Sequence, residues 1–217
     1  MSKIQQIQDL TVPKEVMMVV AVLNAASFES YLVGGCVRDL LMGVKPKDYD
    51  ITTNATPEEI IALFPKTFYE NSYGTVGVVT CGEDLGTVCS DETVKIVEVT
   101  PYRLEGTYSD NRHPDSVKWS KNLEDDLGRR DFTVNSIAYN PVTHEIVDPF
   151  DGQKDIENRL IKAVGDPDVR FNEDALRLMR AVRFMSQLDF NIDTVTRESL
   201  EKNSSLLASI SRERVRD

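Results

Sequence analysis

Residues 32–50 read Leu-Val-Gly-Gly-Cys-Val-Arg-Asp-Leu-Leu-Met-Gly-Val-Lys-Pro-Lys-Asp-Tyr-Asp, and the rest of the chain is organised around this stretch. The apolar run Tyr31–Val33 predicts a short buried strand, because it is mostly aromatic or β-branched and stops at glycine. Apolar residues at helical spacing then predict a helix over Val37–Met42. Gly34 and Gly35 lack Cβ, so N–H groups at the start of this helix can approach a ligand closely, and phosphate is the usual ligand there.

Arg38 lies in the first turn of this predicted helix, where the helix dipole disfavours a cation. An anion bound beside Gly35 would explain its position. A pair of glycines alone also fits an ordinary strand–turn–helix junction, so the phosphate hypothesis depends on support from elsewhere in the chain.

Asp48 and Asp50 are one residue apart in what reads as a second strand, Asp48–Thr52. Side chains at i and i+2 of a strand share a face, with Cα atoms about 6.6 Å apart. Two carboxylates on one face repel each other unless divalent cations lie between them, and Mg²⁺ prefers oxygen ligands. Two metal ions about 4 Å apart can hold the attacking and leaving oxygens of a phosphoryl transfer. The alternative, a solvated turn at Pro46, fits poorly with Ile51 and the β-branched residues after it.

The composition is that of a soluble chain with a sizeable core. The chain has 217 residues, of which 41% are hydrophobic, enough for one large domain or two small ones. No apolar run is long enough to span a bilayer, and the polar start does not resemble a signal peptide. We therefore expect a cytoplasmic protein without a membrane partner, and the oligomeric state stays open.

The cysteines and histidines argue against zinc. Cys36, Cys81 and Cys89 have no CxxC spacing, which fits a reducing compartment, and two histidines are too few for a histidine-rich metal site. The net charge of −11 argues against nucleic-acid binding. Eight arginines between Arg170 and the end nevertheless leave room for a basic C-terminal edge.

Further elements follow from periodicity, caps and turn residues. In chain order we expect a helix over 13–28, a helix over 56–64, strands over 67–69, 75–80 and 93–100, an acidic surface loop over 82–91, a long loop over 103–122 and a helical turn over 122–128. Within the third of these strands, Glu98 is a carboxylate among apolar residues, and a buried acid needs a partner. Glu98 is therefore either a third acid beside the metals or an ordinary edge-strand acid.

Arg129 and Arg130 precede an apolar stretch that ends at Tyr139. This order predicts a helix start that faces an anion, from which Arg130 could reach a triphosphate. The alternative is a pair of solvent-exposed arginines. Further on, turn residues and a change in pattern divide the chain into a mixed α/β part, residues 1–150, and an all-helical part, residues 151–217.

A helix is predicted over residues 172–187, with Asp174, Arg177, Arg180 and Arg183 recurring every three residues. The rest of this helix is so apolar that it must be largely buried, so the charged stripe should line a cleft. Asp174 and Arg177 can pair at i, i+3. The alternative is that this pair only decorates the surface.

Four motifs carry a resemblance to a known family. They are Gly34-Gly35-Cys36-Val37-Arg38-Asp39, Asp48-Tyr49-Asp50, Arg129-Arg130-Asp131-Phe132-Thr133 and Glu173-Asp174-Ala175-Leu176-Arg177. In composition and order they resemble the class II tRNA nucleotidyltransferases, or CCA-adding enzymes, and their bacterial poly(A) polymerase relatives. The resemblance implies an α+β fold, with a polymerase-β-like nucleotidyltransferase head of mixed sheet and helices followed by an all-helical neck.

The resemblance also implies an activity and assigns residues to it. The family transfers CMP and AMP from CTP and ATP to the 3′ end of tRNA without a template, with Mg²⁺ held by Asp48 and Asp50. The residues that would bind nucleotide are Gly34, Gly35, Arg38, Arg130, Asp174, Arg177, Arg180 and Arg183. Among them, Gly35, Arg38 and Arg130 would hold the triphosphate, and Asp174 and Arg177 would read the base.

Two features bear on which member of the family this is. A long loop, Arg103–Val117, favours full CCA addition or A addition, since relatives that add only C are shortened there. The alternatives are a bacterial poly(A) polymerase and the A-adding enzyme of a split CC/A pair. Family members are longer, and Ser211–Asp217 ends inside what reads as a helix, so we expect a chain without the tRNA-binding body and tail.

Overall fold

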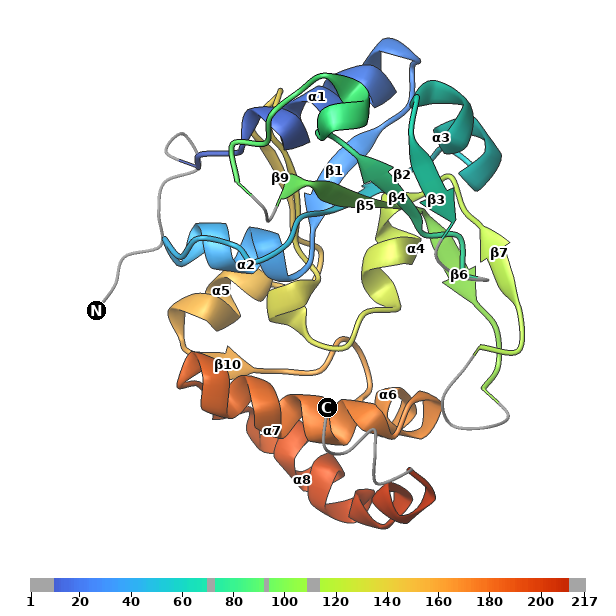
Figure 1. Ribbon diagram of the computed structural model, residues 1–217. Coiled ribbons are helices and arrows are strands. Elements are labelled where there is room, and N and C mark those ends of the chain that lie inside the picture. Colours follow the sequence, from blue (N-terminus) through green and yellow to red (C-terminus); the bar gives the residue numbers. More distant parts are fainter. Residues whose placement is uncertain (1–9, 70–72, 92–93, 109–113, 211–217) are drawn as a thin grey trace.

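A seven-stranded mixed sheet forms the centre of the N-terminal part of the protein (Figure 1). The computed structural model describes residues 10–69, 73–91, 94–108 and 114–210. The strands of the sheet are β1 (Ser30–Val33), β2 (Asp50–Thr53), β3 (Thr67–Tyr69), β4 (Val76–Val79), β5 (Ile96–Pro101), β8 (Ala138–Asn140) and β9 (Glu145–Val147). They lie in the order β3, β4, β5, β2, β1, β8, β9, and only β2 and β5 pair in parallel.

The two faces of β4 and β5 have opposite character. Alternate side chains are buried in one hydrophobic core with helices α1 (Lys14–Ala25) and α3 (Pro57–Leu63). These buried side chains are Val76, Val78, Val97 and Val99. On the opposite face Ile96 and Glu98 of β5 are exposed, which leaves that side of the sheet open.

The elements with strong local signals are confirmed. The strand–glycine–helix order appears as β1, Gly34 and α2 (Gly35–Leu41), and the predicted strands appear as β3, β4 and β5. Pro13 is the N-cap of α1. Helix α3 begins with a capping box, in which the Thr56 hydroxyl accepts from the Glu59 N–H and the Glu59 carboxylate accepts from the Thr56 N–H.

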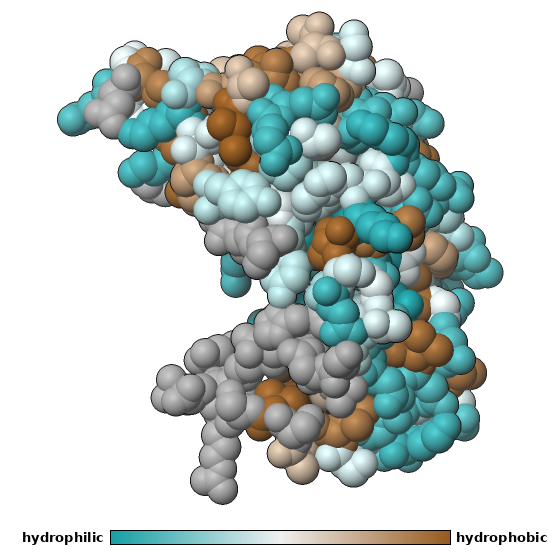
Figure 2. Space-filling model, turned by 90° about the vertical axis from the view of Figure 1, so that its right-hand side faces the viewer, coloured by the Kyte–Doolittle hydropathy of each residue, from teal (hydrophilic) through white to brown (hydrophobic). Residues whose placement is uncertain are grey.

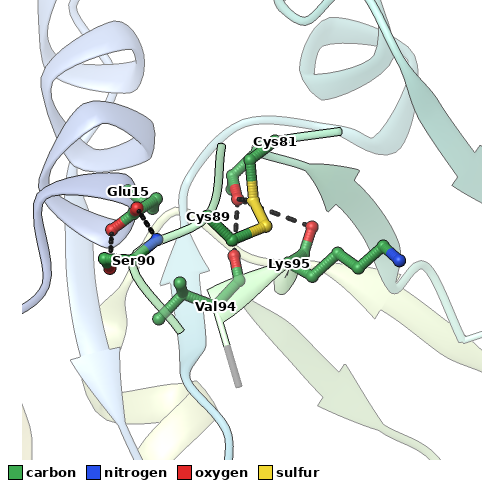
Figure 3. The surroundings of a disulfide bond; sticks show 7 residues. Glu15, Cys81, Cys89, Ser90, Val94 and Lys95 are labelled. Atoms are coloured by element: carbon green, nitrogen blue, oxygen red, sulfur yellow. Dashed lines mark hydrogen bonds between the residues drawn. A yellow bond between two sulfur atoms is a disulfide. The ribbon is translucent and has the colours of Figure 1, made fainter. Parts of the chain in front are cut away.

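The acidic loop over Gly82–Asp91 joins β4 to β5 and is closed at its base by a disulfide bond (Figure 3). Cys81 and Cys89 form this bond, with Cα atoms 5.3 Å apart. Glu15 of α1 holds the same loop, accepting 2.7 Å hydrogen bonds from the N–H and hydroxyl of Ser90. This bond contradicts the reducing environment expected from the cysteine spacing, since disulfides are rare in such compartments. The spacing did not predict the pairing, because it depends on how the loop brings Cys89 back to Cys81.

The loop predicted over 103–122 is wrong in part. Within it, β6 (Arg103–Glu105) and β7 (Val117–Trp119) form an antiparallel hairpin, and residues 109–113 lie outside the described part of the chain. The mixed charges that suggested a loop are paired with each other. The Arg103 guanidinium donates to the Glu105 carboxylate at 2.7 and 2.9 Å.

The helix start predicted at Arg129 is also wrong. Helix α4 (Leu123–Gly128), the predicted acidic turn, ends immediately before this residue. A 3₁₀ turn, η4 (Thr133–Asn135), and strand β8 follow. The end of the apolar stretch forms a β-strand because β8 pairs with β1 inside the sheet. This tertiary pairing outweighs the local pattern.

The C-terminal part is largely but not wholly helical. Its helices are α5 (Gly152–Glu157), α6 (Pro167–Glu173), α7 (Leu176–Leu188), α8 (Thr194–Lys202) and the 3₁₀ helix η5 (Ser204–Ser209). The all-helical description is corrected by β10 (Leu160–Ile161) and β11 (Asn191–Ile192), two connecting segments that pair in parallel. Neither these helices nor any other in the described part of the chain is both long and apolar enough to cross a bilayer.

The single helix predicted over 172–187 is broken at Asp174. This residue has extended backbone angles, φ −136° and ψ 106°, and follows the last residue of α6. Its carboxylate accepts a 3.0 Å hydrogen bond from the N–H of Leu176, the first residue of α7. The aspartate thus accepts from a free N–H group at a helix start. Aspartate is generally favoured in such positions and disfavoured in helix interiors.

The contact between α5 and η4 can be tested with glycine substitutions. A Cβ on Gly152 would lie 2.2 Å from the backbone oxygen of Thr133, so Gly152→Ala should lower the free energy of unfolding by about 1–3 kcal/mol or more. Gly128→Ala is the control, since its Cβ would lie 3.6 Å from Phe150, an ordinary contact. Urea denaturation of both variants measures this, and equal stabilities would contradict the prediction.

Candidate active site

Gly34 lies between a guanidinium group and a carboxylate. It has φ +82°, and a Cβ placed on it would lie 3.2 Å from Nη1 of Arg130 and 3.7 Å from Oδ2 of Asp50. The bare backbone at the start of α2 therefore forms a small cradle that any side chain would fill. Three residues that the sequence analysis singled out, Gly34, Asp50 and Arg130, are brought together here.

Two of the three candidate acids, Asp50 and Glu98, lie side by side in the sheet, and the structure differs from the prediction for Asp48 and for the burial of Glu98. Asp50 and Glu98 are directly paired residues of neighbouring parallel strands, so their side chains leave the same face, with Cα atoms about 4.8 Å apart. Strand β2 begins at Asp50, so Asp48 lies in the exposed segment before it and not in the strand. Glu98 is exposed and not buried, because its face of the sheet is open.

The pKa of the Cys36 thiol is sensitive to the negative charge of these acids. Its buried thiol donates to the backbone oxygen of Val33 at 3.2 Å and lies 3.9 Å from that of Asp50. Burial, the charge of Asp50 and, more weakly, that of Asp48 raise the pKa of Cys36 to about 12. The thiol therefore stays protonated, and both carboxylates act on the first turn of α2.

The guanidinium of Arg38 is held by protein groups. It donates to Asp39 through Nε and Nη2, at 2.9 and 2.7 Å, and to the Asn135 side chain at 2.7 Å. It also lies 5.4 Å from the ring centroid of Phe184 in α7. The anion that explains an arginine in this first turn is therefore Asp39, and contact with a triphosphate stays a prediction.

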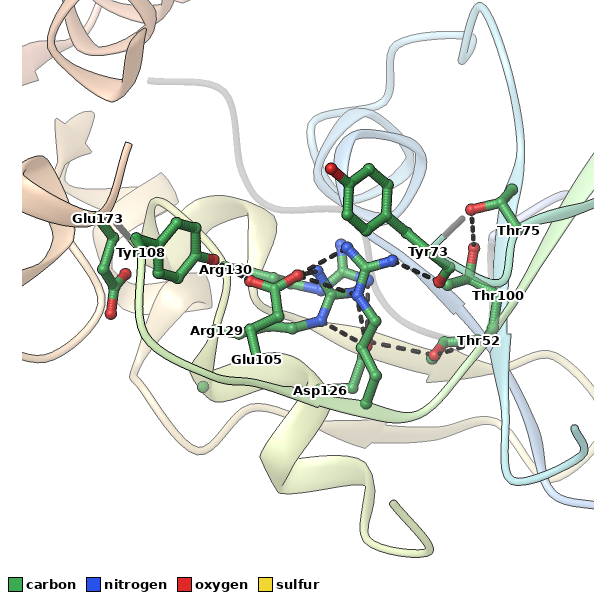
Figure 4. Close-up of polar contacts among 12 residues, drawn as sticks. Thr52, Tyr73, Thr75, Thr100, Glu105, Tyr108, Asp126, Arg129, Arg130 and Glu173 are labelled. Carbon is green, nitrogen blue, oxygen red and sulfur yellow. Dashed lines mark hydrogen bonds and ion pairs between the residues drawn. The ribbon is translucent and has the colours of Figure 1, made fainter. Parts of the chain in front are cut away.

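Asp126 of α4 is a central residue that the sequence analysis missed (Figure 4). Its fully buried carboxylate accepts from Nε and Nη2 of Arg129, from Nη2 of Arg130 at 3.0 Å and from the Thr52 hydroxyl at 3.2 Å. Burial works to raise the pKa of Asp126, but the two guanidinium groups outweigh it and lower the pKa. The available signal was an acid three and four residues before two arginines.

Glu105 joins the β6–β7 hairpin to the same cluster (Figure 4). It accepts from Arg103, from Nη1 of Arg129 at 3.2 Å and from the Tyr108 hydroxyl. Burial opposes ionisation of Glu105, but Arg129, Tyr108 and Arg103 together lower its pKa. Neither arginine of the Arg129-Arg130 pair is solvent-exposed, so that alternative is wrong.

The predicted ion pair between Asp174 and Arg177 is replaced by another. Arg177 is buried and donates to Glu173 at 2.5 Å, and also to the backbone oxygens of Arg129 and Arg170 at 3.1 Å. The break at Asp174 turns that carboxylate toward Leu176, which leaves Glu173 as the acid in reach. Helix α7 is thereby attached to the end of α4.

Arg180 and Arg183 differ in their surroundings. Arg180 donates to the buried carboxylate of Asp131 at 2.7 Å and lies over the Phe184 ring. Burial raises the pKa of Asp131, but Arg180, Asn135 and the N–H of Phe132 together lower it. Arg183 is exposed.

A polar cavity of about 300 Å³ lies between the N-terminal part and the α6–α7 region. It is lined by Tyr73, Arg103, Glu105, Tyr108, Pro114, Arg129, Arg130, Asp131, Asp174, Arg177 and Arg180. Figure 2 shows the hollow between these two parts of the molecule. Four of the predicted nucleotide-binding residues, Arg130, Asp174, Arg177 and Arg180, meet in this cavity, and Arg183 does not line it.

Arg130 carries a polar atom in need of a partner. Its Nε is buried and has no hydrogen-bond partner among the described residues, and its Nη1 is the atom beside Gly34. A buried donor left unpaired costs about 1–3 kcal/mol. An anion bound beside Gly34 would face Nη1 of the same guanidinium.

Residues 30–162 match the family model of the poly A polymerase head domain. The chain belongs to the poly A polymerase head domain family. It is 44% identical to the CCA-adding enzyme of Lactobacillus helveticus, over 100% of this chain and 51% of that protein. It is 49% identical to the CCA-adding enzyme of Geobacillus thermodenitrificans, over 89% of this chain and 45% of that protein. The chain thus spans about half the length of the curated relatives it matches.

Solved structures agree with the family assignment. The Bacillus stearothermophilus CCA-adding enzyme in complex with CTP matches with a TM-score of 0.80 and 42% identity, over 93% of this chain and 46% of that one. The complex of the Thermotoga maritima CCA-adding enzyme with tRNA matches with a TM-score of 0.72 at 22% identity, over 97% and 47%, and bears on the fold alone. The mixed sheet with its helices is therefore the family's head, as predicted.

The Asp126 cluster should control the acid stability of the protein. The folded-state pKa of Asp126 lies below the unfolded value of about 3.9, so its contribution is present above that pH and is lost as the pH falls through the folded-state pKa. Asp126→Asn should lower the free energy of unfolding by about 3–5 kcal/mol at pH 7, because two guanidinium groups lose their buried partner.

Urea denaturation between pH 2 and 7 checks this prediction. The difference in free energy of unfolding between wild type and Asp126→Asn should become smaller toward low pH, because Asp126 is then protonated in the wild type. Glu105 and Asp131 are present in both proteins, so their titration does not affect this difference. Thr52→Val is the matched control, because it removes one neutral donor to Asp126 and should cost only about 1 kcal/mol. A gap that stays constant across the whole pH range would contradict the prediction.

Proposed function

We propose that the protein containing this chain is a template-independent CCA-adding tRNA nucleotidyltransferase, which transfers CMP and AMP from CTP and ATP to the tRNA 3′ end. The observation that carries the proposal is the continuity of two sites through Arg130. One of its ends lies beside Gly34 and Asp50, and the residue also lines the cavity that holds Asp174, Arg177 and Arg180. One nucleoside triphosphate could therefore reach from the acids to the cavity.

Asp48 and Asp50 would hold the metal ions, with Glu98 as a third acid. Carboxylates beside an exposed cradle are the donor set that Mg²⁺ prefers, and Mg²⁺ usually keeps water and substrate phosphates as its other ligands. Among the described residues, no group of three or more His, Cys, Asp or Glu side chains is placed to hold a metal ion, so the proposed site would need ligands from the substrate. Bound Mg²⁺ lowers the pKa of an attacking hydroxyl and stabilises the departing pyrophosphate.

The residues around Gly34 would bind the triphosphate. Backbone N–H groups at Gly34 and Gly35 and Nη1 of Arg130, which lies beside Gly34, would be the donors for this anion. Arg38 is assigned to this set by its motif position, because its guanidinium already donates to Asp39 and Asn135. The reacting end of the nucleotide is thereby held against Asp50.

Asp174, Arg177 and Arg180 would bind the base end of the nucleotide. The contacts of Arg177 with Glu173 and with two backbone oxygens use three of its five N–H groups and fix the plane of its guanidinium. A rigid planar donor beside an acceptor such as Asp174 can read a base edge. Arg183 is assigned by its motif position alone.

The chain would divide into a catalytic head, residues 1–150, and a neck, residues 151–217, that recognises the base. The proposal places the protein in the cytoplasm, with CTP, ATP and tRNA as partners. The 103–117 segment favours CCA or A addition. The second candidate, a bacterial poly(A) polymerase, follows from the name of the matched head domain.

Removal of either acid should abolish nucleotide addition. In the full-length protein, Asp48→Ala and Asp50→Ala should each lower the rate of CMP and AMP incorporation into tRNA by at least about a hundredfold, since metal ions supply several kcal/mol of transition-state stabilisation. Glu157→Ala, which removes an exposed acid of α5, should leave the rate unchanged. Retained activity in either aspartate variant would refute the metal assignment.

The choice of substrates separates the two candidate functions. A CCA-adding enzyme should add a limited C-C-A sequence to tRNA lacking it and should not extend a non-tRNA primer with ATP alone. Processive A tailing of that primer, followed by gel electrophoresis, would support the poly(A) polymerase instead. Absence of CTP and ATP binding with and without Mg²⁺, measured by calorimetry, would contradict both functions.

A further inference from the structure

The open face of the sheet carries an apolar surface next to the acids. Directly paired residues of neighbouring strands point to the same face. The pairs Phe68 with Gly77, Gly77 with Glu98, and Glu98 with Asp50 therefore form one continuous row across β3, β4, β5 and β2 (Figure 1). Phe68 thus lies on the same face as Asp50, three strands away.

Two aliphatic side chains extend this surface. Val79 and Ile96 are paired with each other and lie two residues from Gly77 and Glu98 along their strands, which puts them on the same face. Phe68 is 39% exposed and Ile96 is 43% exposed. We call Phe68, Val79 and Ile96 the apolar shelf.

The ring of Phe68 extends toward the acids because Gly77 makes room for it. A Cβ on Gly77 would lie 2.3–2.7 Å from the three outermost atoms of the ring. The ring therefore covers the glycine backbone and ends beside the strand that carries Glu98. The exposed ring lies over β4, one strand from Glu98 and two strands from Asp50.

The geometry of the site determines which substrate reaches the shelf. Gly34 and Arg130 flank Asp50 on the β1 side, where the triphosphate would lie. In phosphoryl transfer the attacking and leaving oxygens are roughly in line, so the attacking hydroxyl must come from the opposite, β5 side. The nucleotide that bears this hydroxyl is the 3′-terminal nucleotide of the RNA.

We propose that the apolar shelf, and Phe68 above all, is the platform on which the base of the RNA's 3′-terminal nucleotide stacks. The inference rests on the proposed function and adds the residues that receive the RNA end. Stacking on an aromatic ring tolerates any base, because every base has a π-face. The platform therefore suits an RNA end whose last base changes after each addition.

One lysine lies where the shelf meets the end of the sheet. Lys66 immediately precedes β3, is exposed, and is two residues from Phe68, which puts it on the same face. Its backbone oxygen accepts from the N–H of Val79 at 3.1 Å, which places it at the shelf. A cation in this position suits the phosphates that precede the terminal nucleotide.

The test compares Phe68→Ala with Tyr69→Ala in the full-length protein. Tyr69 is the matched control, because it is the adjacent exposed aromatic of the same strand but points to the other face. Phe68→Ala should raise the KM for the RNA about tenfold and leave the KM for CTP unchanged, since loss of one base stack is worth about a factor of ten. Tyr69→Ala should change neither constant.

An RNA that ends in an abasic ribose completes the test. With this primer, wild type and Phe68→Ala should have the same KM, because no terminal base is left to stack. Phe68→Leu, which keeps the sheet covered, should behave like Phe68→Ala, and Phe68→Trp should restore the low KM. Equal effects of Phe68→Ala on both primers would overturn the platform and show a merely structural role.

The two proposals fail in different ways. Wild-type protein that binds nucleotides but adds none to any RNA would overturn the proposed function and the platform together. Active wild type with an unaltered KM for RNA in Phe68→Ala and Phe68→Leu would overturn the platform alone.

Discussion

The structure depends on one buried carboxylate held between two arginines. Asp126 has no exposed surface, so its charge is stable only because Arg129, Arg130 and Thr52 donate to it. Each donor connects Asp126 to a different element. Thr52 belongs to β2, the strand of Asp50, Arg130 lies beside Gly34, and Arg129 donates to Glu105 of the β6–β7 hairpin. Asp126 therefore helps to fix the relative positions of the acids, the cradle at Gly34 and the cavity.

The junction between the N-terminal part and α6–α7 combines apolar packing with charge-assisted hydrogen bonds. Arg170 donates to the backbone oxygen of Gly128, Arg177 to that of Arg129, and Arg180 to Asp131. Such bonds hold orientation more strictly than apolar contact, since guanidinium donors have a fixed planar geometry. Arg177 and Arg180 also line the cavity, so a ligand bound there would compete with the junction for their donors.

Sequence reasoning succeeded where a few neighbouring residues determine the structure. The strand, Gly34 and helix α2 follow from apolar spacing and glycine, and α3 follows from the capping residues Thr56 and Glu59. It failed where a residue's partner is distant in sequence or where two nearby partners compete. Arg177 pairs with Glu173 and not with Asp174, and the stretch after Arg129 includes β8, which pairs with β1. For Asp126 the spacing to Arg129 and Arg130 was a local signal, but its contact with Thr52, 74 residues away, had none.

The parallel pairing of β2 with β5 has a consequence for how the protein folds. Asp50 and Glu98 are neighbours in the sheet, but the chain between them must first build α3 and the β3–β4 pair. On the other side of β2, strand β1 gains its second neighbour only when β8 has been made. Pairings of such high contact order form late. On a ribosome the face that carries Asp50 and Glu98 would therefore stay unassembled until most of the head has been synthesised.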